Sequence, residues 1–275
     1  MRRLLSELGR TPLLILLVLT IVVAIATWWL VGDAFDPLRR LTITGLVALL
    51  AVGIGSMLLL LGLLAGPLHE RLRRTVTTNA AASWTLEGEL AGEPRPAFGG
   101  WAIEPDVAVA LVRVVQSRTP SLVVELGPGA TTELLISLLP EDTELVAIEH
   151  DQGFISGLQE RVRAYDGPVP QLRHAPLTRQ RLPGWTGRWY SPEAFDDLSG
   201  IDLLLVDGPP GNRAFNARFP AVPLLFERLS PGARILVDDS GRPDDRAMID
   251  RWIGDYPLEV SAQGANYRLL KVSSL

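Results

Sequence analysis

Two long apolar runs open the chain, and the residues after them alternate short apolar stretches with amphipathic ones. The runs cover Pro12–Val31 and Leu41–Ala65, and neither contains a charged residue. At about 1.5 Å of rise per residue, each run is long enough as a helix to cross a hydrocarbon core of roughly 30 Å. The pattern therefore predicts a two-helix transmembrane anchor over residues 1–66, with spans at about 12–31 and 41–65.

A cleaved signal peptide is the alternative interpretation of the first run. Arg2 and Arg3 precede it, and Ala24-Ile25-Ala26 resembles a cleavage site. However, the apolar part is longer than that of most signal peptides, and a second run follows closely. We therefore favour an anchor over a signal peptide.

The arginines around the runs predict how the anchor is oriented. They are Arg2, Arg3 and Arg10 before the first run, Arg39 and Arg40 between the runs, and Arg71, Arg73 and Arg74 after the second. Positively charged flanks tend to remain on the cytoplasmic side. We therefore expect a multi-pass protein of the inner (cytoplasmic) membrane, with both termini and the following domain in the cytoplasm.

Beyond the anchor, strand-like and helix-like patterns alternate. Residues 67–103 contain glycines and prolines typical of a juxtamembrane linker and cap. Helices are expected at Pro105–Val115, Thr132–Leu139, Phe154–Arg163, Val222–Leu229 and Ala247–Ile253, and strands at Leu122–Leu126, Leu145–Ile148, around Leu172, at Ile201–Val206 and Ala233–Val237, around Leu258 and at Tyr267–Val272. Continuous apolar strands separated by helices predict an α/β domain over 104–275 with a Rossmann-like, doubly wound, mostly parallel sheet. Such sheets bind ligands at the carboxyl ends of their strands.

The composition narrows the chemistry of this domain. The chain has no cysteine, which excludes disulfides and thiolate metal sites. Its net charge of -5 argues against a nucleic-acid partner. Lys271 is the only lysine, so a phosphate loop of the Walker type, which needs a lysine after its glycines, is excluded.

A glycine turn follows the first strand and reads Glu125-Leu126-Gly127-Pro128-Gly129. A dinucleotide fingerprint would need a third glycine, where this chain has Thr132. The remaining interpretation is the turn that holds S-adenosylmethionine, whose glycines let the backbone approach a cofactor closely. An ordinary strand-to-helix turn is the alternative.

Further segments end the other strands with polar residues. They are Glu149 after the second strand, Arg173-His174-Ala175-Pro176-Leu177 after the third, Asp207-Gly208-Pro209-Pro210-Gly211 after the fourth and Asp238-Asp239 after the fifth, joined by Trp189-Tyr190 and Ala217-Arg218-Phe219-Pro220. Together with the glycine turn, these segments resemble class I S-adenosylmethionine-dependent methyltransferases, in a bacterial branch related to the catechol-O-methyltransferase type. The resemblance covers about Trp101 to Lys271.

The resemblance implies roles for individual residues. The cofactor would be held by Glu125, Gly127, Gly129, Glu149 and the His174-Ala175 turn, with Glu149 at the ribose hydroxyls. Catechol-type enzymes hold a divalent metal such as Mg²⁺ beside the cofactor, and the matching positions are Asp207, Asp238 and Asp239. Asp207 is also the candidate catalytic residue. Two departures are Asp239, where the family has asparagine, and Pro210, where it has a catalytic lysine. The alternative for the aspartates is that they are solvated loop acids or helix caps.

The aromatic residues Trp101, Trp185, Trp189 and Tyr190 suit either an apolar lid over a substrate or the core. The resemblance implies O-methylation, and the predicted anchor suggests a small or membrane-associated acceptor, such as a glycan or lipid-linked molecule. A non-catalytic, cofactor-binding scaffold protein is the alternative, which the missing lysine favours. An NAD-dependent oxidoreductase is a third class, against which Thr132 counts. The acceptor and the oligomeric state, including a homo-oligomer, are left open.

Overall fold

The computed structural model describes residues 11–31, 36–89, 103–210 and 216–273. It divides into two compact units, Met1–Arg74 and Thr75–Leu275. The arginines at positions 2, 3 and 10, and Trp101, lie outside the described residues.

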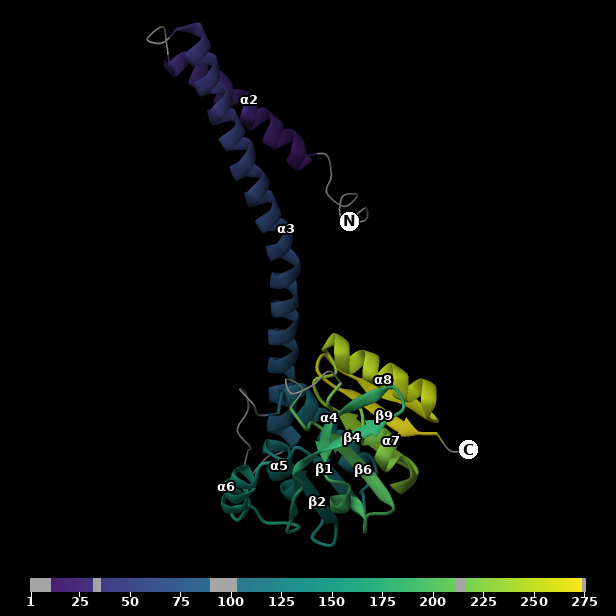
Figure 1. The fold of residues 1–275 in the computed structure, drawn as a ribbon. Helices are drawn as coiled ribbons and strands as arrows, with labels where there is room; N and C mark the ends of the chain where they lie inside the picture. The colour runs from purple at the N-terminus through teal and green to yellow at the C-terminus, as the bar shows by residue number, and fades with distance from the viewer. Residues whose placement is uncertain (1–10, 32–35, 90–102, 211–215, 274–275) are drawn as a thin grey trace. The chain divides into compact units, whose positions relative to one another are not determined.

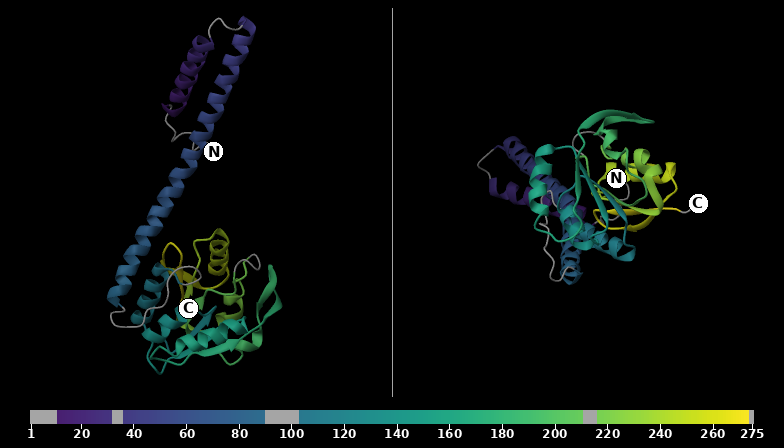
Figure 2. Two further views of the ribbon diagram at one scale, coloured as in Figure 1. Left: turned by 90° about the vertical axis from the view of Figure 1, so that its left-hand side faces the viewer. Right: turned by 90° about the horizontal axis from the view of Figure 1, so that it is seen from below.

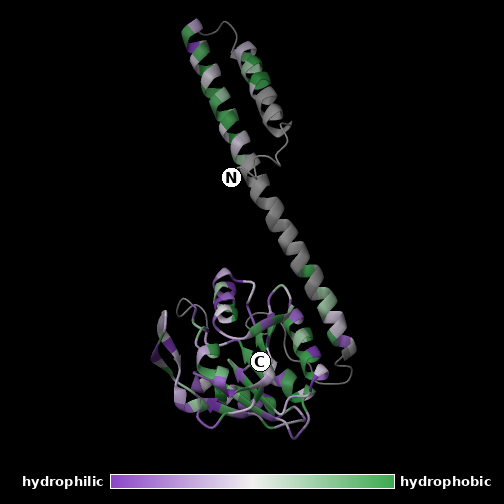
Figure 3. Ribbon diagram, turned by 90° about the vertical axis from the view of Figure 1, so that its right-hand side faces the viewer, coloured by the Kyte–Doolittle hydropathy of each residue, from purple (hydrophilic) through white to green (hydrophobic). Residues whose placement is uncertain are grey.

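Apolar helices make up the described part of the first unit. The helix α2 spans Thr11–Val31, and α3 spans Pro37–Glu89, so α3 ends within the second unit (Figure 1). Hydrophobic positions predominate where α2 and the start of α3 are coloured by hydropathy in Figure 3. Among the described residues, Pro37–Met57 is long and apolar enough to span a membrane, with a mean hydropathy of 1.7, and Thr20–Leu30 is a shorter apolar helix. The two-helix anchor stays a prediction, supported by length and composition.

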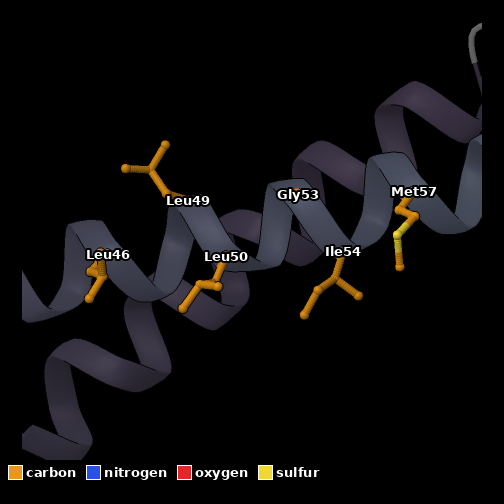
Figure 4. Close-up of a pocket in the computed structure, with 6 residues that line it drawn as sticks. All are labelled: Leu46, Leu49, Leu50, Gly53, Ile54 and Met57. Carbon is orange, nitrogen blue, oxygen red and sulfur yellow. The ribbon is translucent and has the colours of Figure 1, made fainter.

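Around Gly53, α3 carries a shallow apolar hollow (Figure 4). Apart from its chain neighbours and the nearby backbone of α3, no atom of the described residues lies within 4 Å of the position that a Cβ atom of Gly53 would take. The surrounding side chains are Leu46, Leu49, Leu50, Ile54 and Met57. An exposed surface of this composition suits hydrocarbon chains or another apolar helix.

The end of α3 contributes to the core of the second unit. Leu86 is buried in one apolar cluster with Ile103 and Val107. The predicted linker 67–103 is therefore helical as far as Glu89, and the compact unit begins at Thr75 instead of 104. The physical reason is that this last part of α3 carries apolar side chains that pack against α4 (Pro105–Ser117).

A seven-stranded sheet forms the centre of the second unit. Its order is β3-β2-β1-β6-β7-β9-β8, and all neighbouring pairs are parallel except β7 with β9 and β9 with β8. The strands are β1 (Leu122–Leu126), β2 (Glu144–Glu149), β3 (Gln171–His174), β6 (Ile201–Val206), β7 (Leu229–Val237), β8 (Leu258–Gln263) and β9 (Arg268–Val272). The chain starts at β1, moves outward to β3 and then returns past β1 to β6, so the order reverses between β1 and β6. This is a doubly wound sheet, as the sequence predicts.

Helices cover both faces of the sheet because each strand places apolar side chains on both. In β1, Val123 packs into the cluster with α4 and α5 (Ala130–Leu138), whereas Val124 packs into the cluster with α7 (Ala221–Leu225) and α8 (Pro243–Asp255). The helix α6 spans Gln152–Val162, and short 3-10 helices span Pro192–Phe195 and Phe226–Arg228. Figure 2 shows the same layers from two further directions. The alternation of side chains along a strand thus explains the three-layer arrangement.

A hairpin that the sequence pattern did not predict is inserted between β3 and β6. It pairs β4 (Leu177–Leu182) with the antiparallel β5 (Trp185–Tyr190) in a separate two-stranded sheet. Arginines and glutamine interrupt the apolar pattern of β4, and for that reason no strand was expected there. Gly184 makes the turn in the left-handed region, with φ of 66°. Trp185, Trp189 and Tyr190 of β5 are all buried, so the core interpretation of these aromatic residues is confirmed.

The helix expected at Val222–Leu229 is shorter than predicted. α7 ends at Leu225, a 3-10 turn follows, and β7 already begins at Leu229. Elsewhere the predicted strands and helices form within a few residues of their expected bounds.

Candidate functional site

Four parallel strands end at the same edge of the sheet and bring their polar loops together. The register aligns Leu126 of β1 with Ile148 of β2 and with Val206 of β6, and aligns Val206 with Val237 of β7. A cavity of about 320 Å³ opens at this edge. Its lining consists of the turn Gly127–Thr131 together with Ile103, Glu133, Phe154, Arg161 and Asp207. The cavity therefore lies where a doubly wound sheet binds its ligand.

Gly127 is required by the backbone around it. Its φ is 83°, in the left-handed region, and an added Cβ would lie 2.8 Å from the nitrogen of Gly208. The loop after β6 is held there because Asp207 and Gly208 both donate their N–H groups to the carbonyl of Leu126, at 3.0 and 2.7 Å. Gly127 thus lets the loops after β1 and β6 pass each other in contact.

Gly129 serves a different purpose in the same turn. It lines the cavity, and a Cβ added there would meet no atom of the described residues within 4 Å beyond its two chain neighbours. It immediately precedes α5, whose first N–H groups lack partners within the helix and form a partial positive charge. The turn therefore offers open space and hydrogen-bond donors to a ligand at Gly129.

Glu125 is fully buried beneath this turn. Its carboxylate accepts a hydrogen bond from the hydroxyl of Thr131 and another, at 2.7 Å, from that of Thr132. The hydroxyl oxygen of Thr132 in turn accepts the N–H of Gly129 at 2.9 Å. Burial raises the pKa of Glu125 to about 8, against the opposing effect of the two threonine hydrogen bonds. The structure thus places this predicted cofactor residue as a brace for the glycine turn, away from the lining of the cavity.

Glu149 and the His174-Ala175 turn are brought together at the ends of β2 and β3. The Oε1 atom of Glu149 accepts the N–H groups of His150 and Asp151, both at 2.7 Å. The N–H of Ala175 donates to the carbonyl of Glu149 at 2.7 Å, and Nε2 of His174 lies 3.1 Å from the carbonyl oxygen of His150. Glu149 is 7% exposed, and its Oε2 atom has no hydrogen-bond donor among the residues that the structure describes.

The three predicted metal-ligating aspartates meet an arginine instead of forming an open set of oxygens. Nη2 of Arg218 donates to Oδ1 of Asp207 at 2.8 Å and to Oδ2 of Asp239 at 3.0 Å. Nη1 donates to the carbonyl oxygen of Asp238 at 3.0 Å. Within the described part of the chain, no group of three or more histidine, cysteine or acidic side chains is arranged to hold a metal ion. The residues present therefore do not fit the divalent metal that the sequence resemblance implies.

The electrostatics of this cluster follow from its burial. Burial raises the pKa of Asp207, although the charge of Arg218 opposes the effect. Burial also raises the pKa of Asp238 to about 8, and the neighbouring charges of Asp207 and Asp239 add to the rise. Asp239 adopts φ of 59°, a conformation that aspartate and asparagine tolerate better than most residues. The left-handed backbone conformation at position 239 therefore explains why aspartate or asparagine suits this position.

Sequence reasoning did not assign functions to Arg218 or to the hydroxyl of Tyr190. The Tyr190 hydroxyl lies against Gly208, is buried and has no hydrogen-bond partner among the described residues. Tyr190 comes from the unpredicted hairpin, so no local pattern pointed to its position. Arg218 lies within Ala217–Pro220, one of the segments that carry the sequence resemblance, but only the fold shows which acids it contacts.

No protein-family model matches the sequence, and a search of curated proteins found no relative. Solved structures do resemble it. A methyltransferase from Geobacter sulfurreducens is 13% identical, with a TM-score of 0.48 over 71% of this chain and 88% of that one. An O-methyltransferase from Bacillus cereus in complex with SAH is 16% identical, with a TM-score of 0.47 over 74% and 91%.

A third structure is the O-methyltransferase TomG from Streptomyces achromogenes in complex with SAM. It is 17% identical, with a TM-score of 0.43 over 73% of this chain and 90% of that one. Because these TM-scores are below 0.5, the fold assignment rests on the strand order and the connections of the sheet. The second unit has a Rossmann-like, doubly wound, mostly parallel sheet, as predicted.

Proposed function

We propose that the protein is an S-adenosylmethionine-dependent methyltransferase. The observation that carries the proposal is the turn at the cavity, in which Gly129 leaves room beside the N-terminus of α5 while Glu149 ends the adjacent strand. The open space suits close approach of a cofactor, and Oε2 of Glu149 suits its ribose hydroxyls. A sheet of this topology binds nucleotide-like ligands at this edge.

The reaction class follows from the polar groups near the cavity. The bound cofactor supplies a methyl group on a positively charged sulfur, and an acceptor oxygen forms a new bond to that methyl carbon as the bond to sulfur breaks. The acceptor hydroxyl must lose its proton. Asp207 lines the cavity, and Arg218 holds only its Oδ1 atom. We assign Asp207 to orient the acceptor hydroxyl and take its proton.

The acceptor we propose is a small or membrane-associated molecule, such as a glycan or lipid-linked hydroxyl. The apolar stretches Thr20–Leu30 and Pro37–Met57 support a membrane anchor. The flanking arginines are the reason for proposing an inner-membrane protein with a cytoplasmic catalytic domain. An enzyme held at the membrane meets membrane-associated acceptors at high effective concentration.

A cofactor-binding scaffold is the second candidate function. It is favoured by Pro210, where the related enzymes carry a lysine, and by the pairing of Asp207 with Arg218. It predicts cofactor binding without methyl transfer.

Calorimetry on the full chain in detergent micelles tests both candidates. S-adenosylhomocysteine should bind the wild type, and Glu149→Gln should weaken binding by about tenfold because an amide accepts fewer hydroxyl hydrogen bonds. Glu144→Gln, at the exposed start of the same strand, is the matched control. Absence of binding to the wild type would eliminate both candidates.

Methyl transfer separates the enzyme from the scaffold. With labelled S-adenosylmethionine and a membrane lipid extract, the wild type should label an acceptor. Asp207→Asn should abolish labelling while keeping the affinity for S-adenosylhomocysteine within about threefold, because its role is in the reaction step. Cofactor binding with no labelled product in any extract would favour the scaffold.

A further inference from the structure

A single nitrogen of Arg218 occupies the space between two of the acids. Nη2 lies 2.8 Å from Oδ1 of Asp207, which follows β6, and 3.0 Å from Oδ2 of Asp239, which follows β7. An ion placed between these same two oxygens, at the distances of about 2.0–2.6 Å that divalent cations prefer, would clash with this nitrogen.

The side chain of Arg218 is buried and held in place by its contacts. Its side chain is 5% exposed, and its position is fixed from three sides by Asp207, Asp239 and the carbonyl of Asp238. A buried charge is tolerated only when it is paired and hydrogen-bonded. These contacts pair both Nη atoms of Arg218, while its Nε has no hydrogen-bond partner among the described residues. Phe219, the residue after Arg218, is also held in place, because its carbonyl oxygen accepts the indole N–H of Trp252 at 3.0 Å.

One carboxylate oxygen of the third acid is engaged by the neighbouring backbone. Oδ1 of Asp238 accepts the N–H of Asp239 at 2.6 Å. Arg242 adds a second positive charge at the rim, 2.8 Å from Oδ2 of Asp239 and 54% exposed. Between Asp207 and Asp239 the positive charge is thus supplied by Arg218, while Arg242 contacts Asp239 alone from the exposed rim.

We propose that Arg218 is a built-in cation that takes the place of the divalent metal of catechol-type methyltransferases, and that this protein works without a metal at the strand ends. The catalytic part of the inference rests on the proposed function. The claim that Arg218 excludes a divalent ion from the aspartates does not depend on it. Arg218 is a positioning residue, which fixes one oxygen of Asp207 and leaves the other for the acceptor.

Electron paramagnetic resonance of Mn²⁺ titrated into the full chain in detergent micelles tests the exclusion. The wild type should bind no Mn²⁺ at this cluster, and Arg218→Ala should gain affinity by at least about tenfold, because a charge within 3 Å of two carboxylates is removed. Adding Asp207→Asn to Arg218→Ala should remove the gained site. Arg242→Ala is the matched control and should gain none, since Arg218 remains in place.

Two results would overturn the proposal. One is a Mn²⁺ site in the wild type that Asp207→Asn abolishes. The other is a folded Arg218→Ala that gains no Mn²⁺ affinity. Tryptophan fluorescence reports folding near the cluster through buried Trp252, and Arg218→Gln, which keeps donor groups without the charge, replaces the alanine variant if that variant does not fold.

Binding of S-adenosylhomocysteine, measured separately, distinguishes failure of the proposed function from failure of this inference. If the cofactor product does not bind but the Mn²⁺ results are as expected, the proposed function fails and the exclusion by Arg218 stands. If the product binds and methyl transfer by the wild type is lost on adding a chelator, the metal-free reaction is wrong.

Discussion

Two glycines that look equivalent in the sequence have different environments. Gly127 adopts a left-handed φ and lies against the backbone of Gly208, whereas Gly129 faces the open cavity. The motif alone assigned both to the cofactor. The neighbouring loop after β6, which is distant in sequence, makes the first of them a requirement of the fold.

Alanine substitutions should separate the two glycines. Gly127→Ala should lower the free energy of unfolding by about 1–3 kcal/mol, because of the left-handed backbone and the contact with Gly208. Gly129→Ala should lower it by less than about 1 kcal/mol but weaken binding of S-adenosylhomocysteine, because its methyl group enters the cavity. Urea unfolding and calorimetry measure the two effects, and equal losses of stability would contradict this assignment.

Glu125 predicts a specific dependence of stability on pH. The pKa of its side chain is about 8 in the folded protein, against 4.5 for an unburied glutamate. Between these values the folded state keeps a proton that the unfolded state has released, so the contribution is fully present below about pH 4.5 and is lost as pH rises to about 8. The slope reaches about 1.4 kcal/mol per pH unit.

Glu125→Gln should remove that slope. The difference in free energy of unfolding between variant and wild type should therefore shift in favour of the variant as pH rises from 5 to 8. Urea unfolding at a series of pH values measures it. Parallel curves for the two proteins would show that Glu125 is ionised in the folded state.

At the scale of elements, the C-terminal part of α3 behaves as part of the α/β unit. Leu86 is 3% exposed within the cluster that includes α4, whereas Trp84 on the same helix is 77% exposed. The sequence predicted a linker here because the glycines and prolines after position 91 are typical of loops. The apolar residues before them are too few to show a clear helical periodicity.

Substitutions on α3 test its place in the core. Leu86→Ala should lower the free energy of unfolding by about 2–5 kcal/mol, the range for deleting a buried leucine side chain. Trp84→Ala is the control and should change it by less than about 0.5 kcal/mol, since its side chain lies at the surface. A small effect of Leu86→Ala on the free energy of unfolding would show that this segment is a linker and not part of the core.

At the scale of the whole molecule, the predicted anchor and the α/β unit expose different kinds of surface. The exposed side chains of Leu49 and Leu50 on α3 suit hydrocarbon, while the second unit buries its apolar side chains on both sheet faces. The proposed location of the protein follows from that division.

Membrane insertion can be tested with charges on one helix. Leu50→Arg lies within Pro37–Met57 and should shift protein from the membrane pellet to the soluble or aggregated fraction after carbonate washing, because an arginine at the centre of a span costs about 2.5–3.5 kcal/mol. Val76→Arg, on the same helix beyond that stretch, should leave the pelleted fraction unchanged. Equal behaviour of wild type and Leu50→Arg would argue against a spanning helix.

The local sequence determined the strands, most of the helices and the acids at the strand ends, because period, apolar runs and glycine turns are set by near neighbours along the chain. It therefore predicted the doubly wound sheet and the edge at which the loops after β1, β2 and β6 lie. The tertiary structure alone decided that Glu125 is a buried brace, that the hairpin delivers Tyr190 to Gly208, and that Arg218 stands between Asp207 and Asp239. Those contacts join residues that are far apart in the sequence, in separate loops and strands. The periodicity of a sequence depends on near neighbours and therefore does not predict which distant side chains come into contact.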